Sequence, residues 1–122
     1  MLTAFLLPVM VLAQKDDDKC VFPTNKKVLK QLDKAHNASL APKDQFQALK
    51  DILEIDPECV QAMLEMGTRS YQNNLERANL GQKSSFEYAV KYFSDAISIC
   101  PQYAADPYYY LGVIYYGEKN NA

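Results

Sequence analysis

Few side chains in this sequence have the types and spacing that metal binding requires. The cysteines are Cys20, Cys59 and Cys100, and the only histidine is His36. No two cysteines have Cys-x-x-Cys spacing, so we expect no zinc site. In an oxidising compartment one pair of cysteines could form a disulfide and leave the third free. Each cysteine is otherwise explained as a small, buried, apolar side chain.

Catalytic chemistry has as little support in the sequence. A Ser-His-Asp triad needs a histidine held between a nucleophile and a carboxylate, whereas His36 lies on a predicted helix stripe where packing explains it. Asp51 and Glu54 lie on a predicted helix surface, and the sequence contains no glycine-rich phosphate loop. The sequence at 37–39, Asn-Ala-Ser, fits a glycosylation sequon, which matters only in a eukaryotic secretory pathway. We therefore expect no enzymatic activity, no cofactor and no metal.

Composition and charge fit one small folded domain. The chain has 122 residues, of which 48% are hydrophobic and 23% charged, and its formal net charge is -2. Nucleic-acid binding needs clustered Lys and Arg, whereas the basic residues here are interleaved with acidic ones. We therefore expect no nucleic-acid partner. Tyrosine is unusually frequent, with nine Tyr and no Trp.

The first residues have the profile of a secretory signal peptide. Residues 1–12 are apolar apart from Thr3, and a charged segment follows at 15–19. The run is too short to span a bilayer as a helix, and cleavage is expected after Ala13. A buried N-terminal helix is the alternative, which Pro8 disfavours. We therefore assign residues 1–13 to a signal peptide and 14–25 to a linker, and expect the mature chain to have no integral membrane span.

The elements that must position any binding residues are all predicted to be helices. Apolar residues recur at helical spacing, and no segment shows sustained strand alternation. The predicted helices cover 26–37, 42–55, 58–73, 85–100 and a last segment that begins at Asp106-Pro107. Residues 75–82 are expected to form a loop or a frayed extension. Ser84 and Glu87 have the spacing of a capping box.

The helices are organised as a repeat. Ile55-Asp56-Pro57 and Ile99-Cys100-Pro101 end two helices in the same way, and the helices that follow contain Gly67 and Gly112 at nearly the same offset. A glycine inside a helix usually has a packing reason, here the close approach of a neighbouring helix. Periodicity of this kind indicates a self-similar helix–turn–helix unit.

Residues at fixed offsets then show a resemblance to a known family. The last segment and the helix before it resemble the first-helix and second-helix signatures of tetratricopeptide repeats. The residues that carry the resemblance are Tyr108, Leu111, Gly112 and Tyr115 for the first helix, and Ala89, Phe93, Ala96 and Pro101 for the second. The resemblance implies an all-α solenoid of antiparallel helix pairs. Its repeats would cover 26–59, 60–103 and, as a truncated last repeat, 104–122.

The match is imperfect in its first two units. Tyr71 lies one place late, an insertion at 73–83 separates the two helices of the middle unit, and Asp33 stands where a small residue is expected. The third unit lacks its second helix, so that Tyr108, Leu111 and Tyr115 have no neighbour in this sequence. Since a solenoid normally ends in a capping helix, we expect an N-terminal fragment of a longer protein.

The resemblance also implies a concave binding groove lined by the first helices. The residues expected to face it are Gln61, Leu64, Thr68, Tyr71, Gln72, Tyr109, Val113 and Tyr116. Exposed tyrosines are good anchors for a partner because they are large and rigid and carry a polar tip. The alternative is that a following repeat buries Tyr109 and Tyr116.

The expected function is a non-catalytic scaffold for a protein or peptide partner. The chain is similar to the N-terminal repeats of bacterial envelope proteins with an OmpA-like domain, which would place it in the periplasm or at the outer membrane. Contact with peptidoglycan or the outer membrane would then come from downstream domains. Two alternatives stay open: an extracytoplasmic ligand- or glycan-binding helical module, and repeats that regulate a downstream enzyme domain.

Overall fold

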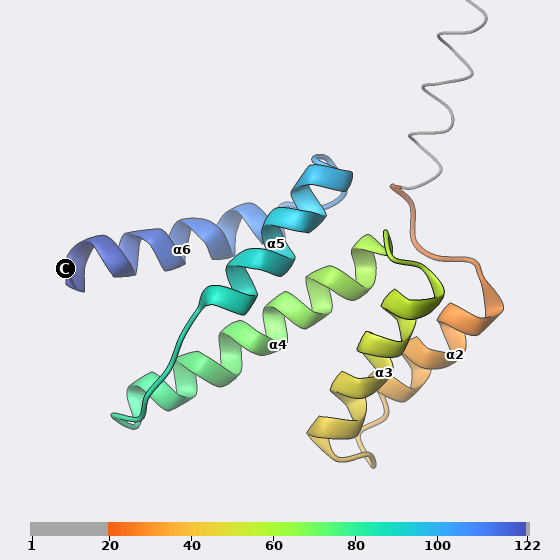
Figure 1. The fold of residues 1–122 in the computed structure, drawn as a ribbon, viewed down its shortest axis with the longest axis horizontal. Coiled ribbons are helices and arrows are strands. Elements are labelled where there is room, and N and C mark those ends of the chain that lie inside the picture. The colour runs from red at the N-terminus through yellow and green to blue at the C-terminus, as the bar shows by residue number, and fades with distance from the viewer. Residues whose placement is uncertain (1–19, 122) are drawn as a thin grey trace, which may run out of the picture.

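The computed structural model describes residues 20–121, and this part of the chain is built from helices without any strand. The helices are α2 (Lys26–Ala35), α3 (Pro42–Ile55), α4 (Val60–Asn79), α5 (Glu87–Ile99) and α6 (Asp106–Asn121) (Figure 1). The all-α prediction is thus confirmed for these residues. The predicted signal peptide and the first six residues of the predicted linker lie outside them.

Helices α2 and α3 pack together around the first of two apolar clusters. Asn25 caps α2, because its Oδ1 accepts hydrogen bonds from the backbone N–H groups of Lys27 and Val28 at 2.8 and 3.3 Å. Pro42 begins α3, where a missing N–H costs nothing. The buried members of the first cluster are Val28, Leu32, Ala35, Ala48, Leu49, Ile52, Cys59, Ala62 and Met66.

Helices α4 and α5 pack around the second cluster, and Figure 1 shows α5 lying along α4. A Cβ atom placed on Gly67 would lie 2.7 Å from Cε1 of Phe93, so this glycine permits the close approach that the sequence predicts. The buried members of the second cluster are Val60, Met63, Leu64, Ala89, Phe93, Ala96, Cys100 and Ile114.

The connection between α4 and α5 differs from the prediction. Helix α4 continues to Asn79, six residues beyond its predicted end, and Gly81 follows with a φ of 72°. The predicted capping box is absent: the backbone N–H of Glu87 donates to Oγ of Ser85 at 3.2 Å, and the N-cap residue is Phe86. Helix α5 therefore begins two residues later than predicted.

Two turns in the chain have the same backbone geometry. Asp56 ends α3 with φ -139° and ψ 95°, and Cys100 ends α5 with φ -139° and ψ 83°. Each carbonyl accepts a hydrogen bond from the N–H three residues later, Cys59 in one turn and Tyr103 in the other. The two Ile-x-Pro segments are therefore alike in backbone structure as well as in sequence.

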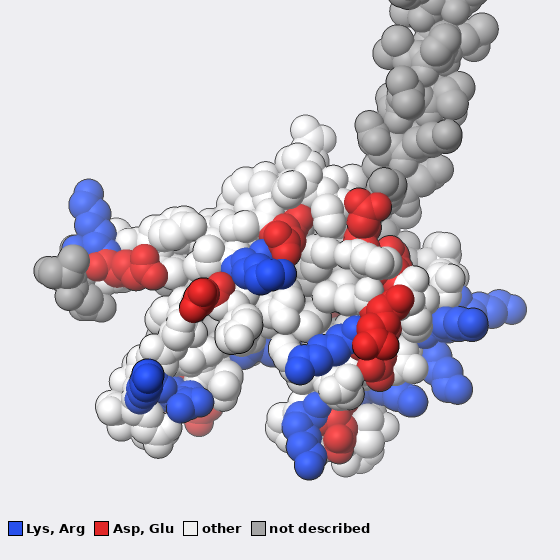
Figure 2. Space-filling model, viewed as in Figure 1, with Lys and Arg blue, Asp and Glu red and all other residues white. Residues whose placement is uncertain are grey.

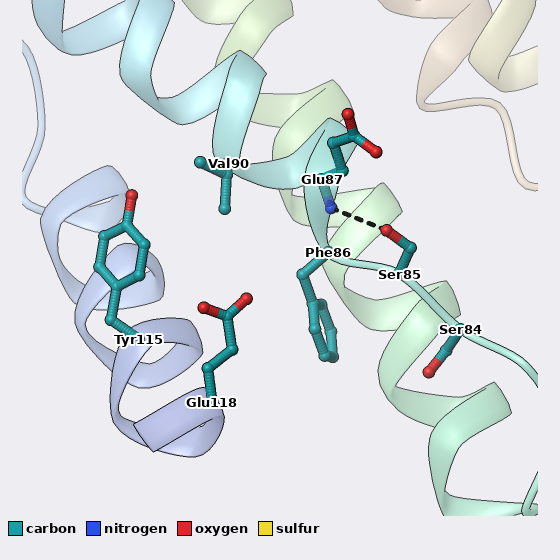
Figure 3. A pocket seen from close by; sticks show the side chains of 7 residues that line it. All are labelled: Ser84, Ser85, Phe86, Glu87, Val90, Tyr115 and Glu118. Atoms are coloured by element: carbon teal, nitrogen blue, oxygen red, sulfur yellow. Dashed lines mark hydrogen bonds between the residues drawn. The ribbon is translucent and has the colours of Figure 1, made fainter. Parts of the chain in front are cut away.

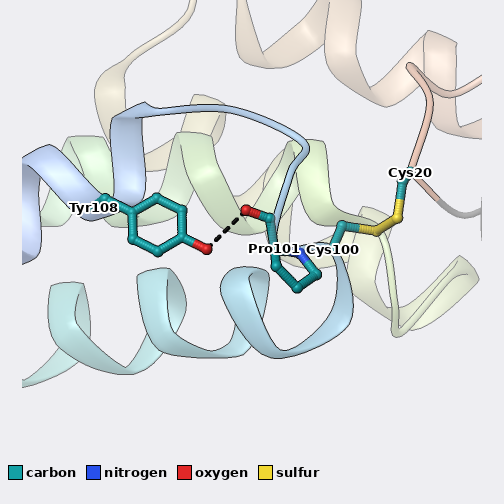
Figure 4. The surroundings of a disulfide bond; sticks show 4 residues. All are labelled: Cys20, Cys100, Pro101 and Tyr108. Atoms are coloured by element: carbon teal, nitrogen blue, oxygen red, sulfur yellow. Dashed lines mark hydrogen bonds between the residues drawn. A yellow bond between two sulfur atoms is a disulfide. The ribbon is translucent and has the colours of Figure 1, made fainter.

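A disulfide joins the start of the described chain to the second of these turns. Cys20 and Cys100 are bonded, with their Cα atoms 5.5 Å apart, and Cys59 is free and buried (Figure 4). One pair of cysteines is thus bonded and the third is free, which is the arrangement that the sequence allows in an oxidising compartment. Residues 20–25, which belong to the predicted linker, are therefore tied covalently to the helical body. None of the helices within residues 20–121 has the length and apolarity needed to cross a bilayer.

Candidate interaction surface

Helix α6 lies against α4 and α5 through one stripe of side chains. Ile114 is buried, and Tyr110 and Leu111 are partly buried against the second cluster. These residues are spaced i, i+1 and i+4, which places them on one side of a helix. They attach α6 to the rest of the protein and leave its other sides outward.

An aromatic stack anchors this stripe. The ring of Tyr110 is stacked on Phe93 with centroids 5.1 Å apart and planes 6° apart, and it contacts Tyr71 at 5.0 Å. Tyr71 in turn contacts Phe86 at 5.5 Å. Aromatic pairs at these distances add to the stability gained from burial alone. The packing of these rings therefore holds α6 in place, and with it the side chains on its outward side.

The outward side of α6 is apolar and rich in tyrosine. Residues 107–117 contain no charged side chain. The large hydrophobic side chains exposed on α6 are Tyr108 (49%), Tyr109 (68%), Val113 (37%), Tyr115 (53%) and Tyr116 (72%). In Figure 2 charged residues are dense over α2 and α3, whereas α6 is largely white before its C-terminal end. A contiguous apolar surface of this kind typically marks an interaction site.

The structure divides the predicted groove residues into two groups. Leu64 is buried in the second cluster, and Tyr71 belongs to the aromatic stack, so both side chains serve packing. Thr68 is half-buried, and its hydroxyl donates to the carbonyl of Leu64. Gln61 is half-buried and hydrogen-bonded on both sides. The exposed members of the predicted groove are Gln72, Tyr109, Val113 and Tyr116.

The repeat-signature residues behave differently on α6 and in the α4–α5 pair. Gly67, Ala89, Phe93 and Ala96 are buried between α4 and α5. Pro101 lies exposed in the turn after α5. On α6, Leu111 is partly buried, whereas Tyr108 and Tyr115 are exposed and a Cβ atom on Gly112 would meet nothing within 4 Å. Tyr110 and Ile114 were not predicted to be packing residues, although their i, i+4 spacing was a signal in the sequence.

A chain of polar contacts joins the two helix pairs. Nε2 of His36 contacts Oε1 of Glu65, Nε2 of Gln61 donates to Oε2 of the same carboxylate at 2.8 Å, and the hydroxyl of Tyr103 donates to Oε1 of Gln61 at 2.7 Å. Burial, followed by the nearby Cys59 and Glu65, raises the pKa of Tyr103 above that of a free tyrosine. His36 was predicted to pack on the apolar stripe. It is instead exposed at the C-cap of α2, where Glu65 is within reach.

An open hollow lies between α6 and the beginning of α5 (Figure 3). Tyr115 and Glu118 line it from α6, and Glu87 and Val90 line it from α5. The connecting segment contributes Ser84, Ser85 and Phe86. This lining has one tyrosine and two carboxylates, and the hollow is open to solvent rather than a closed cavity.

Comparisons with known proteins do not identify the chain: no family model, no curated protein and no solved structure matches it. Within residues 20–121 no three His, Cys, Asp or Glu side chains are grouped so that they could hold a metal ion.

Proposed function

We propose that this chain is a non-catalytic protein-interaction module of the tetratricopeptide type, and that its binding surface is the tyrosine-rich outward side of α6. The observation that carries this proposal is the exposure of Tyr109 and Tyr116, at 68% and 72%, on a helix whose opposite stripe is fixed by stacked aromatic rings. Tyrosines presented rigidly lose little conformational entropy when a partner binds.

The solenoid arrangement is supported by the way α4 and α6 are used. Both helices follow an Ile-x-Pro turn of the same geometry. Met66 lies one residue before Gly67 and packs in the first cluster, whereas Leu111 lies one residue before Gly112 and packs against the second cluster. Each helix thus contacts the preceding helix pair through the same register position. This repetition supports our proposal that the helix pairs are stacked as in a solenoid.

The residues that lie two positions after Gly67 and Gly112 agree with this register. The guanidinium of Arg69 donates to the carbonyl of Ala35 at 2.7 Å and to Oε1 of Gln45 at 2.9 Å, both in the first pair. Ile114 has the matching position on α6 and is buried in the second cluster. The residue two positions after the glycine therefore contacts the preceding helix pair in both places, through polar contacts at Arg69 and through apolar packing at Ile114.

Export is supported by the disulfide. Disulfides persist in extracytoplasmic compartments and are rare in reducing ones, and Cys20 and Cys100 are bonded here. Together with the signal-like sequence at 1–13, this favours a scaffold of the cell envelope. The tetratricopeptide assignment and the envelope location rest on the sequence resemblance and on these features.

The proposed binding surface on the outward side of α6 can be tested by photocrosslinking in the producing cell. We would place a photoreactive phenylalanine at Tyr109 and, as a control, at Lys30, which is exposed on α2. We expect one discrete crosslinked protein from position 109 and none from position 30, and we expect Tyr116→Ser to reduce the yield. Equal labelling at both positions, or none at 109, would overturn the proposed surface.

A glycan-binding module is less well supported. Such a module needs tyrosines that converge on an enclosed polar pocket. Tyr109 and Tyr116 instead point along an outward helix side, and the hollow beside Tyr115 contains no second tyrosine. Titration of the chain with oligosaccharides by calorimetry would reverse this preference if it gave saturable binding that Tyr115→Ala abolished.

A further inference from the structure

A short strap, formed by residues 20–25, runs beside the junction of the two helix pairs before α2 begins. Figure 1 shows it in orange, close to the start of α4, with which it shares a hollow. Its side chains are largely outward, with Val21 exposed at 59% and Phe22 at 54%. Cys20, at its beginning, packs against the second cluster. The strap therefore lies on the surface and is attached to the core at one end.

The hollow lies between this strap and the α3–α4 turn. Residues 21–25 line one side of it, and Val28 continues that side into α2. Asp56, Glu58 and residues 59–61 line the other side, from the turn and the start of α4. Its volume, about 290 Å³, has room for several water molecules. Open space thus separates part of the strap from the turn, and packing across the hollow holds the strap only weakly.

The disulfide is what fastens the strap to the helical body. Among residues 20–121, no hydrogen bond or ion pair joins residues 20–24 to a helix. Asn25 bonds to the start of α2, which follows it directly. Cys20 is bonded to Cys100 at the end of α5 (Figure 4). Cleavage of this one bond therefore removes the link that holds the strap in place.

The third cysteine lies on the wall of the same hollow. Cys59 is free, and 4% of it is exposed. Residues 21–25 line the hollow opposite to it, whereas the first cluster, to which Cys59 belongs, covers it from within the body. Access of solvent to this thiol from the hollow therefore depends on the position of the strap.

We propose that residues 20–25 form a redox-operated strap: reduction of the Cys20–Cys100 bond releases it and exposes the thiol of Cys59, while the helix pairs stay folded. The co-reactant is a dithiol, whose thiolate attacks one sulfur of the bond. Two electrons and two protons pass from the dithiol, which becomes a disulfide, and Cys20 and Cys100 become thiols. Oxidation reverses the change. This inference does not involve the proposed binding surface on α6, so the two can fail separately.

The rate at which a small maleimide labels Cys59 tests the proposal. We would compare the oxidised wild-type chain with a Cys20→Ser, Cys100→Ala double variant, in which the strap is not fastened. Each protein has Cys59 as its one free thiol, so labelling can be followed by intact mass. At neutral pH we expect labelling of the double variant to be at least tenfold faster. Equal rates would overturn the proposal.

Lower stability alone can also speed labelling, because every cysteine is exposed when the chain unfolds. Tyr110→Ala is the matched control, since it keeps the disulfide and the strap but removes a ring that holds α6. Labelling of the two variants would be compared at urea concentrations that give them the same free energy of unfolding. We expect the double variant to remain at least tenfold faster. Equal rates at equal stability would assign the exposure to unfolding and overturn the proposal.

The wild-type sequence provides a second test that needs no substitution. After reduction with a small dithiol, circular dichroism should retain the helical signal. Backbone order parameters from NMR should fall in the strap and stay unchanged in α4 and α5, and reoxidation should restore them. Unchanged order parameters in the strap would show that it stays in place without the bond. Loss of the helical signal would show that the bond supports the whole fold. Either result would overturn the proposal.

Discussion

Cys20 and Cys100 are bonded across 80 residues of sequence, which brings the segment before α2 to the C-terminal end of α5. The covalent loop therefore contains both helix pairs and the junction between them. Since Cys100 is also buried in the second cluster, the bond ties the entry to the first pair directly to the core of the second. The relative placement of the pairs is thus held by a covalent link in addition to packing.

Loss of this disulfide should lower stability substantially. A cross-link that closes a long loop reduces the entropy of the unfolded chain, and such bonds contribute about 2–4 kcal/mol. We expect Cys20→Ser, which alters only the half-buried partner, to lower the free energy of unfolding in urea by this amount. A dithiol reductant should lower the wild-type protein to the same value and leave the variant unchanged. Equal stability of oxidised and reduced wild-type protein would contradict the prediction.

The free thiol of Cys59 should be protected and should make stability depend on alkaline pH. Its exposure is 4%, and burial raises its pKa above the ordinary thiol value, with Asp56 adding to the effect. The folded state therefore keeps its proton to higher pH than the unfolded chain does. The stability that this provides is complete below the pKa of the unfolded thiol and is lost as pH rises from about 8.5 through the raised value.

Two measurements test the Cys59 prediction. Maleimide labelling at neutral pH should be slow in the folded protein and fast in urea. Urea titrations between neutral and alkaline pH should show a steeper loss of stability for the wild-type protein than for Cys59→Ala. Because Tyr103 also titrates with a raised pKa nearby, a Tyr103→Phe variant is needed to separate the two groups. Rapid labelling of the folded protein would mean that the site opens readily.

The helix boundaries were predictable where the sequence contains a residue that cannot continue a helix. Helix α3 begins at Pro42 and ends before Asp56-Pro57, as predicted, because proline constrains both itself and the residue before it. Helix α4 was predicted to end near Asn73, yet no glycine or proline lies between that residue and Gly81. The positive φ of Gly81 marks the actual stop. The C-terminal part of α4 is polar and projects beyond the core, so the spacing of apolar residues could not predict that the helix continues there.

The candidate site was harder to predict than the fold for a related reason. Helix α6 is apolar on nearly every side, so periodicity could not select the stripe that packs. The family resemblance drew attention to Tyr108 and Tyr115, while Tyr110 and Ile114 make the contacts that hold the helix. Which side of such a helix is buried depends on the surface that α4 and α5 present to it, and that surface exists only after they have packed. The close contact at Gly67, in contrast, was predictable from the sequence, because this glycine lies inside a predicted helix and not in a turn.

Substitution of Gly67 should reveal how tightly α4 and α5 pack. Alanine improves helix propensity by up to about 1 kcal/mol, but its Cβ would lie 2.7 Å from the ring of Phe93. Because overpacking of a filled core costs about 1–3 kcal/mol, we expect a net loss of stability in Gly67→Ala. In a double-mutant cycle, Phe93→Leu should remove most of the clash. Gly112→Ala is the control and should be neutral or stabilising. Equal gains at both glycines would show that the two helices do not approach closely.

The aromatic stack under α6 should determine whether this helix stays ordered. Tyr110 lies between Phe93 and Tyr71, at 5.1 and 5.0 Å from their ring centroids. Removing a half-buried aromatic ring by Tyr110→Ala should cost roughly 2–3 kcal/mol, somewhat below the range for fully buried rings. It should also raise amide hydrogen exchange throughout α6 while α2 and α3 remain protected. Tyr109→Ala is the matched control, since its ring is exposed and meets Tyr110 only at its edge, and it should change exchange little. Similar exchange in both variants would mean that the stripe of Leu111 and Ile114 holds α6 without the stack.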